Sequence, residues 1–409
     1  MTGGPAGAAA GPGAAVPAHS LRVVVPRYGE NVVGGAESLA RELSARLAAG
    51  GRSVEVWTTC ATDSSTWVNQ EPPGRGRDGA VSVLRFPVGM RRRPRLFREL
   101  SRGFFRLPRP LRPESAWIIL QGPWTPALVR ALRRGPPGAT LFVGYLYHPT
   151  LAGLPVTPGL RLVLPTAHDE RPLRLRAVGR AVAAAHGIWY ATVEERELLE
   201  SVHPVARSIP SVVGNMGIEP PADPDPERFR RHAGISGDYL FHGGRTATGK
   251  GIDELLAAMA ALRRRVPECV LVLAGEAGDG IGQVPGVVGA GRLDRKTWWD
   301  ALSGAAAVVV PSFLESLSIL TLEAWAAARP VLANAASPVL AAQVERSGAG
   351  IAYRGAQGFV EAAARLLEDP AQATALGGRG RAFVERDYRW DAVLGRFDEL
   401  LTAARRHAG

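Results

Sequence analysis

Short apolar runs that alternate with segments of helical periodicity constrain the fold more than any other feature of this sequence. An apolar run over residues 20–25 leads through a glycine-rich turn into a helical pattern over residues 38–49, and the next apolar run covers residues 54–58. This β-turn-α-β order is the opening of a doubly wound parallel sheet. We therefore predict an α/β protein.

The same alternation restarts after a Pro- and Asp-rich connector at residues 220–226. It predicts two αβ halves joined near residue 218, and 409 residues are enough for two ordinary domains. The last segment, residues 388–406, has the pattern of an amphipathic helix, and residues 252–265 form another helical pattern. Further strands are predicted at residues 81–86, 116–120, 140–143, 187–190, 208–213, 239–242, 269–274, 306–310, 331–333 and 350–353.

Composition limits the partners and the compartment. The formal net charge is +11, which indicates an anionic partner such as a phosphate-bearing substrate, a membrane surface or nucleic acid. Only Cys60 and Cys269 are present, so we expect no disulfide framework, no cysteine metal cluster and a cytoplasmic protein. No apolar run reaches the roughly 18 residues of a membrane span. Residues 1–19 are mostly Gly, Ala and Pro and are expected to form a disordered tail.

Residues 310–330 combine an apolar run, a polar turn and a helical pattern. Glu315 and Glu323 lie eight residues apart, and a helix entered near Ser316 would bring Glu323 back toward the same face. The free N–H groups of such a helix start can hold an anion. Together these features suit a ligand that is both sugar and phosphate. The alternative is two solvated carboxylates flanking an ordinary αβ unit.

Two glycine-rich turns follow predicted strands. Gly34 and Gly35 would let backbone approach a ligand at the start of the first helix, although ordinary turn chemistry explains them too. The loop at residues 243–251 carries Arg245 and Lys250, which suit a diphosphate, or else form a solvated basic turn. It is not a Walker A loop, because Gly251 follows Lys250.

Two further segments have both a functional and a structural interpretation. His168 follows the apolar run at residues 162–164 and has acidic neighbours, so it is placed to face a cleft, although a lone His is more often structural. Residues 91–112 alternate Arg with Leu and Phe, which suits an anionic membrane surface or a solvated arm of the first domain. Pro94, Pro108 and Pro110 limit any long helix there.

The order Gly-Gly-Ala-Glu, then His-Asp, then Gly-Arg-x4-Lys-Gly, then Glu-x7-Glu resembles glycosyltransferase family 4, the retaining enzymes of GT-B architecture. The resemblance covers residues 20 to 409. It implies two Rossmann-like domains facing a cleft, with residues 20–217 binding the acceptor, residues 218–387 binding a nucleotide sugar, and residues 388–409 returning as a helix to the first domain.

The resemblance also implies residue roles. Arg245 and Lys250 would hold the donor diphosphate, Glu323 the ribose hydroxyls and Glu315 the sugar hydroxyls, while His168 would contact the sugar near its reacting face. No protein nucleophile and no metal is then needed, and the only co-substrate is a UDP- or GDP-linked sugar. The remaining donor-binding residues implied are Gly34, Gly35, Gly244, Arg292, Leu293, Leu317, Ser318 and Ile319.

The sequence departs from the family pattern at Ser316, Ser318 and Ala328, where the family usually has Gly. The leading expectation is transfer of a hexose-type sugar to a lipid-linked or natural-product acceptor, with peripheral membrane contact through residues 91–112. The alternative is a non-catalytic nucleotide-sugar-binding subunit. No nucleic-acid fold signature supports a nucleic-acid partner, and a GT-B epimerase fits the motif spacing less well.

Overall fold

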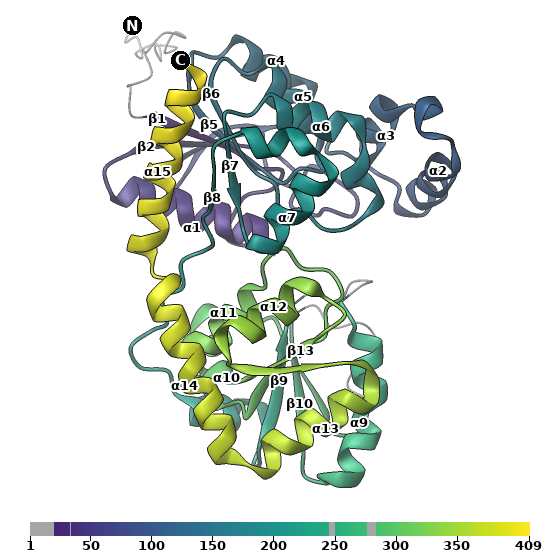
Figure 1. Ribbon diagram of the computed structural model, residues 1–409, viewed down its shortest axis with the longest axis vertical. Helices are drawn as coiled ribbons and strands as arrows, with labels where there is room; N and C mark the ends of the chain where they lie inside the picture. The colour runs from purple at the N-terminus through teal and green to yellow at the C-terminus, as the bar shows by residue number, and fades with distance from the viewer. Residues whose placement is uncertain (1–19, 33, 245–249, 276–283) are drawn as a thin grey trace, which may run out of the picture.

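The computed structural model describes residues 20–32, 34–244, 250–275 and 284–409, and the expected tail at residues 1–19 lies outside them. Two αβ halves stand one above the other in Figure 1, each built around its own sheet. The predicted α/β fold with two doubly wound halves is confirmed.

The upper sheet has eight strands within the described residues, in the order β3-β4-β2-β1-β5-β6-β7-β8. Neighbouring strands are parallel except for the antiparallel β3–β4 pair at one edge. Its elements are β1 (Ser20–Val24), α1 (Gly35–Ala49), β2 (Ser53–Thr59), β3 (Gly74–Asp78), β4 (Val81–Phe86), α2 (Pro94–Arg106), α3 (Glu114–Gln121), α4 (Pro126–Arg134), β5 (Gly138–Val143), α5 (His148–Gly153), β6 (Gly159–Leu164), α6 (Arg176–Ala183), β7 (Gly187–Tyr190), α7 (Val193–Val202) and β8 (Ser211–Val213), with short 3-10 turns at Arg109–Leu111, Leu154–Val156, Arg171–Arg174 and Pro204–Ser208.

The lower sheet is parallel throughout its described part, in the order β11-β10-β9-β12-β13-β14. Its elements are α8 (Pro226–Ala233), β9 (Tyr239–Gly243), α9 (Ile252–Arg265), β10 (Val270–Ala274), β11 (Val287–Gly291), α10 (Arg295–Gly304), β12 (Ala307–Val310), α11 (Ile319–Ala326), β13 (Val331–Asn334), α12 (Pro338–Ser347), β14 (Gly350–Tyr353), α13 (Gly355–Glu368) and α14 (Pro370–Asp387).

The chain ends in a long helix, α15 (Trp390–Ala408), that runs back along the upper half (Figure 1). Its buried face includes Trp390, Phe397 and Leu400, which join the apolar core beneath the upper sheet. The Phe397 ring lies 5.5 Å from that of Trp189 on β7. The predicted return of the C-terminal helix to the first domain is therefore confirmed.

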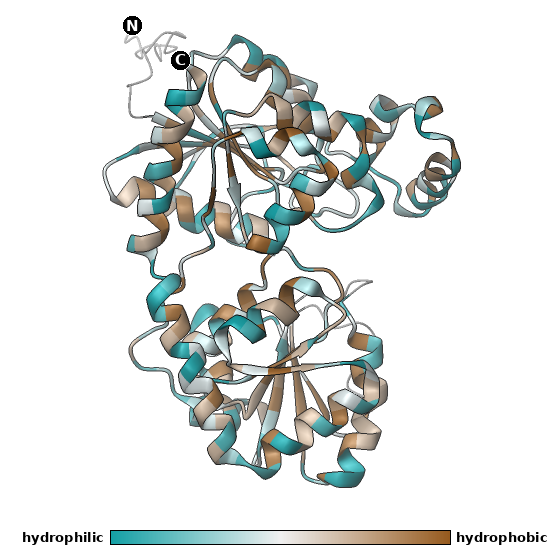
Figure 2. Cartoon of the chain, viewed as in Figure 1, coloured by the Kyte–Doolittle hydropathy of each residue, from teal (hydrophilic) through white to brown (hydrophobic). Residues whose placement is uncertain are grey.

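Hydrophobic strands form the centre of each half, and teal, hydrophilic residues dominate the outward faces of the helices in Figure 2. Strands such as β7 and β12 are buried along their whole length, as expected for parallel strands covered on both faces.

The strand predicted at residues 116–120 is wrong, because this segment forms α3. Its buried residues are Glu114, Trp117, Ile118 and Gln121, which follow the i, i+3, i+4, i+7 spacing of one helical face. A short apolar run such as WIIL does not by itself distinguish a strand from a buried helix. The edge strand β3 was not predicted, because its sequence, GRGRD, lacks apolar residues.

Candidate functional site

A cleft of about 440 Å³ lies between the two halves. The first half lines it with the α1 N-terminus and the loop before it, including Gly34, Gly35 and Glu37. The second half lines it at the carboxyl ends of β9 and β12, where ligands bind in open α/β sheets. The predicted residues that line it are Gly34, Gly35, Gly244, Lys250, Leu293, Glu315, Leu317, Ser318, Ile319 and Glu323.

Lys250 and Glu315 meet inside the cleft. The Lys250 Nζ donates to Glu315 Oε1 at 2.6 Å, and the two side chains are 31% and 12% exposed. Lys250 is followed by Gly251, the N-cap residue of α9, which has a left-handed conformation at φ 71°. A Cβ at Gly251 would lie 2.1 Å from the carbonyl oxygen of Pro311, so the backbone of the two loops approaches closely only because this residue is glycine.

Glu323 lies on α11, and its carboxylate is almost completely buried. It accepts a hydrogen bond from Trp298 Nε1 at 2.8 Å and forms an ion pair with Arg295. Neither Arg295 nor Trp298 was predicted. Their three-residue spacing in the first turn of α10 is the signal that places both side chains on one face.

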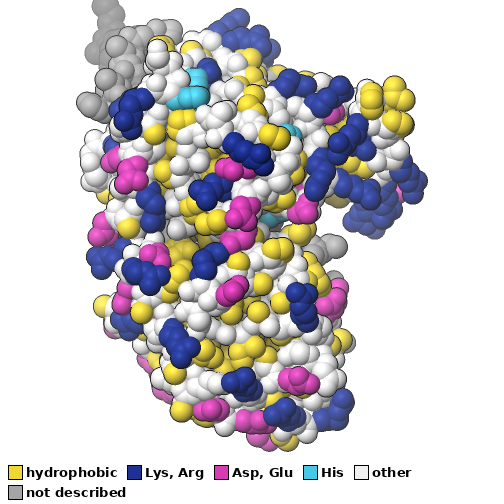
Figure 3. Space-filling model, viewed as in Figure 1, with side chains coloured by type: hydrophobic (Ala, Val, Ile, Leu, Met, Phe, Trp, Pro, Cys, Tyr) yellow, Lys and Arg dark blue, Asp and Glu magenta, His cyan; other side chains and the backbone are white. Residues whose placement is uncertain are grey.

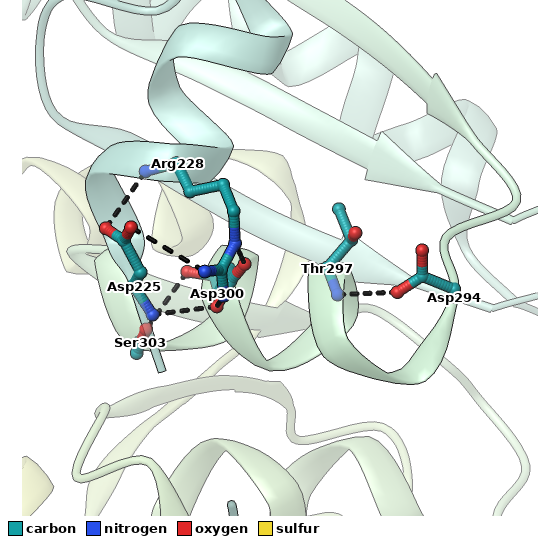
Figure 4. Close-up of polar contacts among 6 residues, drawn as sticks. All are labelled: Asp225, Arg228, Asp294, Thr297, Asp300 and Ser303. Carbon is teal, nitrogen blue, oxygen red and sulfur yellow. Dashed lines mark hydrogen bonds and ion pairs between the residues drawn. The ribbon is translucent and has the colours of Figure 1, made fainter. Parts of the chain in front are cut away.

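Two carboxylates, the exposed Asp294 and the buried Asp300, fix α10, as Figure 4 shows. Asp294 caps the helix by accepting from the Thr297 N–H at 2.8 Å. The fully buried Asp300 accepts from Arg228 Nε at 2.5 Å and from the Asp225 N–H at 2.7 Å, which ties α10 to the start of α8. These contacts hold the first turn of α10 against Glu323.

The predicted helix entry near Ser316 is wrong, because α11 begins at Ile319 with Ser318 as its N-cap. The Ser318 hydroxyl accepts from the Thr321 N–H at 3.3 Å. Glu315 therefore lies in the irregular turn before the helix and does not share a helical face with Glu323. Tertiary packing, rather than helical periodicity, brings both carboxylates to the cleft.

His168 comes from the first half but interacts electrostatically with Glu315 and Lys250 of the second half. Burial lowers its pKa, against the opposing effects of the Glu170 and Glu315 carboxylates. Its Nδ1 atom is buried and has no hydrogen-bond partner within the described part of the chain. The lowered pKa favours the neutral form of the ring, which lies beside the cleft.

The loop that carries His168 is held by a buried carboxylate, Glu195 on α7. Glu195 accepts from the Ala167 N–H at 2.5 Å and from the Ala191 N–H at 2.6 Å. Desolvation raises its pKa to about 7, although both hydrogen bonds favour the charged form.

His242, at the end of β9, also lines the cleft and was not predicted. Its Nδ1 lies 2.8 Å from the Val309 carbonyl oxygen, which can only accept, so Nδ1 carries the proton in that bond. Complete burial lowers its pKa to about 4. The Nε2 atom is then a neutral acceptor on the side of Gly244.

Three predicted residues are placed differently from the rest, and the first of them, His168, is not among the residues that line the cleft. Arg292 is not among the residues that line the cleft, and it donates to the Asn31 carbonyl oxygen of the first half at 3.4 Å. Arg245 lies outside the described residues. On the first-domain side, Glu37 pairs with buried Arg27, whose Nε donates to it at 2.9 Å.

Comparison with known proteins finds similar sequences over part of the chain. Residues 237–369 match the model of the family described as glycosyl transferases group 1. A D-inositol 3-phosphate glycosyltransferase of Frankia alni is 30% identical over 251 residues, which are 55% of this chain and 60% of that protein. A glycogen synthase of Mycobacterium tuberculosis is 29% identical over 41% of this chain and 43% of its own. The chain thus spans about half the length of these relatives.

Solved structures match almost the whole fold. A sucrose-phosphate synthase from Thermosynechococcus elongatus superposes with a TM-score of 0.67 at 20% identity, over 94% of this chain and 100% of its own. Anabaena HepE in complex with UDP-glucose gives a TM-score of 0.67 at 15% identity, and the superposition covers 94% of this chain and 99% of HepE. At these identities the likeness concerns the fold alone.

Proposed function

We propose that this chain is a retaining glycosyltransferase, because residues 237–369 match the model of the group 1 glycosyl transferases and the chain has a two-domain GT-B fold. It moves a hexose-type sugar from a UDP- or GDP-linked donor to an acceptor hydroxyl. The observation that carries this proposal is the arrangement of Lys250, Glu315 and Glu323 around one interdomain cleft. A cation and two carboxylates there match a donor that has both phosphates and hydroxyls.

Charge development during glycosyl transfer explains this set of groups. The sugar becomes positive and the leaving diphosphate becomes negative. Lys250 and the N-terminus of α11 supply positive potential on the diphosphate side. Arg245 is proposed to add a second cation. The leaving phosphate oxygen takes the proton of the attacking hydroxyl on the same face of the sugar, so the reaction needs neither a protein nucleophile nor a metal.

The hydroxyl-binding side of the site is built from fixed acceptors. Glu323 is proposed to bind the ribose, since Arg295 and Trp298 already orient its carboxylate. Glu315 is proposed to bind sugar hydroxyls, and His168 to contact the sugar from the first domain. HepE, whose structure contains UDP-glucose, supports a uridine-linked donor as the first to test.

The first experiment is thermal stabilisation by a panel of nucleotide diphosphates and nucleotide sugars, with and without EDTA. A ligand that binds only the folded state raises the melting temperature by mass action. We expect one nucleotide series to stabilise the protein with EDTA present, and Lys250→Ala and Glu323→Ala to lose the shift. Lys296→Ala, an exposed lysine on α10, is the matched control. Stabilisation without donor hydrolysis or transfer would instead indicate a non-catalytic binding subunit.

The acceptor is proposed to be lipid-linked or a small natural product, with peripheral contact to an anionic membrane through the α2 region. Exposed Leu96, Leu100 and Leu111 lie among arginines there. Figure 3 shows dark blue side chains gathered over this projecting region. No helix of the described chain is long and apolar enough to cross a membrane.

Membrane contact is tested by sedimentation with anionic vesicles. We expect salt-sensitive binding that weakens in a variant with Arg91, Arg93 and Arg95 changed to Gln. Arg92 is left intact, because it bonds to backbone carbonyls. Binding that is equal on neutral and anionic vesicles would contradict the electrostatic contact.

A further inference from the structure

A second pocket, separate from the interdomain cleft, lies in the first half. It has a volume of about 460 Å³. Its walls come from four segments: the loop after β2, the loop just before α2, one side of α2, and the turn that follows His168. The residues that line it are Ser65, Arg92, Pro94, Phe97, Arg98, Ser101, Arg102, Phe105 and Arg171.

One face of α2 forms the longest wall. The α2 residues of this wall are spaced by one and three residues in turn, which places them in a single helical stripe; they are Phe97, Arg98, Ser101, Arg102 and Phe105. The exposed leucines of the same helix, Leu96 and Leu100, are not part of this stripe.

The wall is fixed rather than free to collapse. At the N-terminal end of α2, Arg92 donates to the carbonyl oxygens of Ser65 at 2.9 Å and Gln121 at 3.2 Å. At the other end, Arg112 donates to the Leu107 carbonyl oxygen at 3.0 Å. Between them, the rings of Phe97 and Phe105 lie 5.8 Å and 5.6 Å from Trp117.

The charge on this pocket is strongly positive. Arg92, Arg98, Arg102 and Arg171 all line it, and no Asp or Glu is among its described lining residues. Arg102 has a carboxylate partner, Glu99, at 2.6 Å on the exposed surface. Arg98 and Arg171 reach the same pocket from different elements, and the ion pairs found within the described chain include neither of them.

The pocket is connected to the reaction site through the backbone. Arg171 is three residues from His168, and the segment between them is fixed where the Tyr145 hydroxyl donates to Glu170 at 2.7 Å. A ligand held by Arg171 would therefore lie on the same turn as His168, which interacts with Glu315 and Lys250 of the cleft.

We propose that this pocket is an acceptor subsite for a phosphate ester, whose phosphate lies between Arg98 and Arg171 and whose carbon part packs on Phe97 and Phe105. Arginine is suited to this role because its planar fork can donate two parallel hydrogen bonds to phosphate. The inference rests on the proposed function, since it names the class of acceptor that the transferase would use. It differs from the membrane contact, which uses the outward leucines and arginines of α2.

Calorimetric titration of the full chain tests the pocket with three probes. Octyl phosphate below its micelle concentration stands for a lipid source, glucose 6-phosphate stands for a free sugar phosphate, and octyl glucoside is the uncharged comparison. We expect at least one phosphate ester to bind, and octyl glucoside not to bind. Tighter binding of octyl phosphate assigns a lipid-linked source, whereas tighter binding of glucose 6-phosphate assigns a free phosphate ester.

Two double variants of equal charge change distinguish binding in the pocket from non-specific attraction to a basic surface. Arg98→Gln with Arg171→Gln should weaken the bound phosphate ester about 10-fold or more. Arg130→Gln with Arg133→Gln removes the same charge from exposed positions of α4 outside the pocket lining and should change binding less than twofold. Equal loss in both pairs, or no phosphate binding by the unaltered protein, would overturn the proposal.

The donor site provides an independent readout. The Arg98 and Arg171 variant should keep its nucleotide-induced thermal shift, because neither residue lines the interdomain cleft. The unaltered protein could bind octyl phosphate in an Arg98-dependent way and yet show no thermal shift with any nucleotide. That result would support the phosphate-ester site but contradict the transferase proposal.

Discussion

Lys250 and Glu315 form an ion pair with each other on the second-domain side of the cleft, 2.6 Å from Nζ to Oε1. Each is proposed to bind a different part of the donor, one its phosphates and the other its sugar. In the structure described here, each neutralises its partner. Donor binding would therefore exchange this contact for two contacts with the ligand, and the pair keeps both side chains ordered inside the cleft beforehand.

Removing the cation should therefore damage catalysis more than folding. We expect Lys250→Ala to lower kcat/KM by about 100-fold or more, since preorganised charge at a developing anion is among the largest catalytic contributions. The melting temperature should change little, because the Lys250 side chain is partly exposed. Initial rates of transfer or donor hydrolysis measure this, with Lys296→Ala as control. A loss below threefold would remove Lys250 from the mechanism.

Trp298→Phe tests the orientation of Glu323. The change removes the indole N–H that donates to the carboxylate at 2.8 Å but keeps an aromatic ring. A hydrogen bond to a charged group contributes about 1.5 to 3 kcal/mol, so the donor KM should rise by roughly 10- to 100-fold, with a smaller effect on kcat. An unchanged KM for every nucleotide sugar would contradict the role of Glu323 in donor binding.

Gly251→Ala tests the close approach that places Lys250. The new Cβ would lie 2.1 Å from the Pro311 carbonyl oxygen, so the loops must separate. Gly234→Ala is the matched control, because Gly234 has a similar φ of 66° but no atom within 4 Å of its would-be Cβ. The control should cost about 1 to 2 kcal/mol in free energy of unfolding, and Gly251→Ala should cost more and abolish nucleotide-induced stabilisation. Urea unfolding and thermal shift measure the two effects.

Glu195 should make stability fall as pH rises. Its pKa is about 7 in the folded protein and 4.5 in the unfolded chain, so between these values the folded state binds more protons. The contribution of Glu195 to the free energy of unfolding is therefore greatest below about pH 4.5. It decreases by about 3 kcal/mol between there and about pH 7. The difference in unfolding free energy between the unaltered protein and Glu195→Gln, measured from pH 4.5 to 7.5, should follow this slope. A difference that stays constant with pH would show that Glu195 does not titrate in this range.

Ala328 adopts a left-handed φ of 55°, a conformation that favours glycine. A residue other than glycine in this conformation destabilises the folded state by about 1 to 2 kcal/mol. Glycine avoids this strain, but its greater conformational freedom stabilises the unfolded chain, which offsets part of the gain. Ala328→Gly should therefore raise the free energy of unfolding by about 0.5 to 1 kcal/mol without changing activity. A decrease in stability would mean that the unfolded-state effect is the larger one.

The sequence determined the α/β class, the two halves, the returning C-terminal helix and a set of residues that mostly line one cleft. These follow from local patterns, because parallel strands are apolar runs, and glycines and cations stand where strands end. The sequence did not determine whether residues 116–120 form a strand or a helix, since a short apolar run fits both. Only the tertiary structure decided that Lys250 pairs with Glu315, that Arg295 and Trp298 hold Glu323, and that Arg98 and Arg171 share a pocket. These contacts join residues far apart in the chain, and their geometry depends on how whole elements pack.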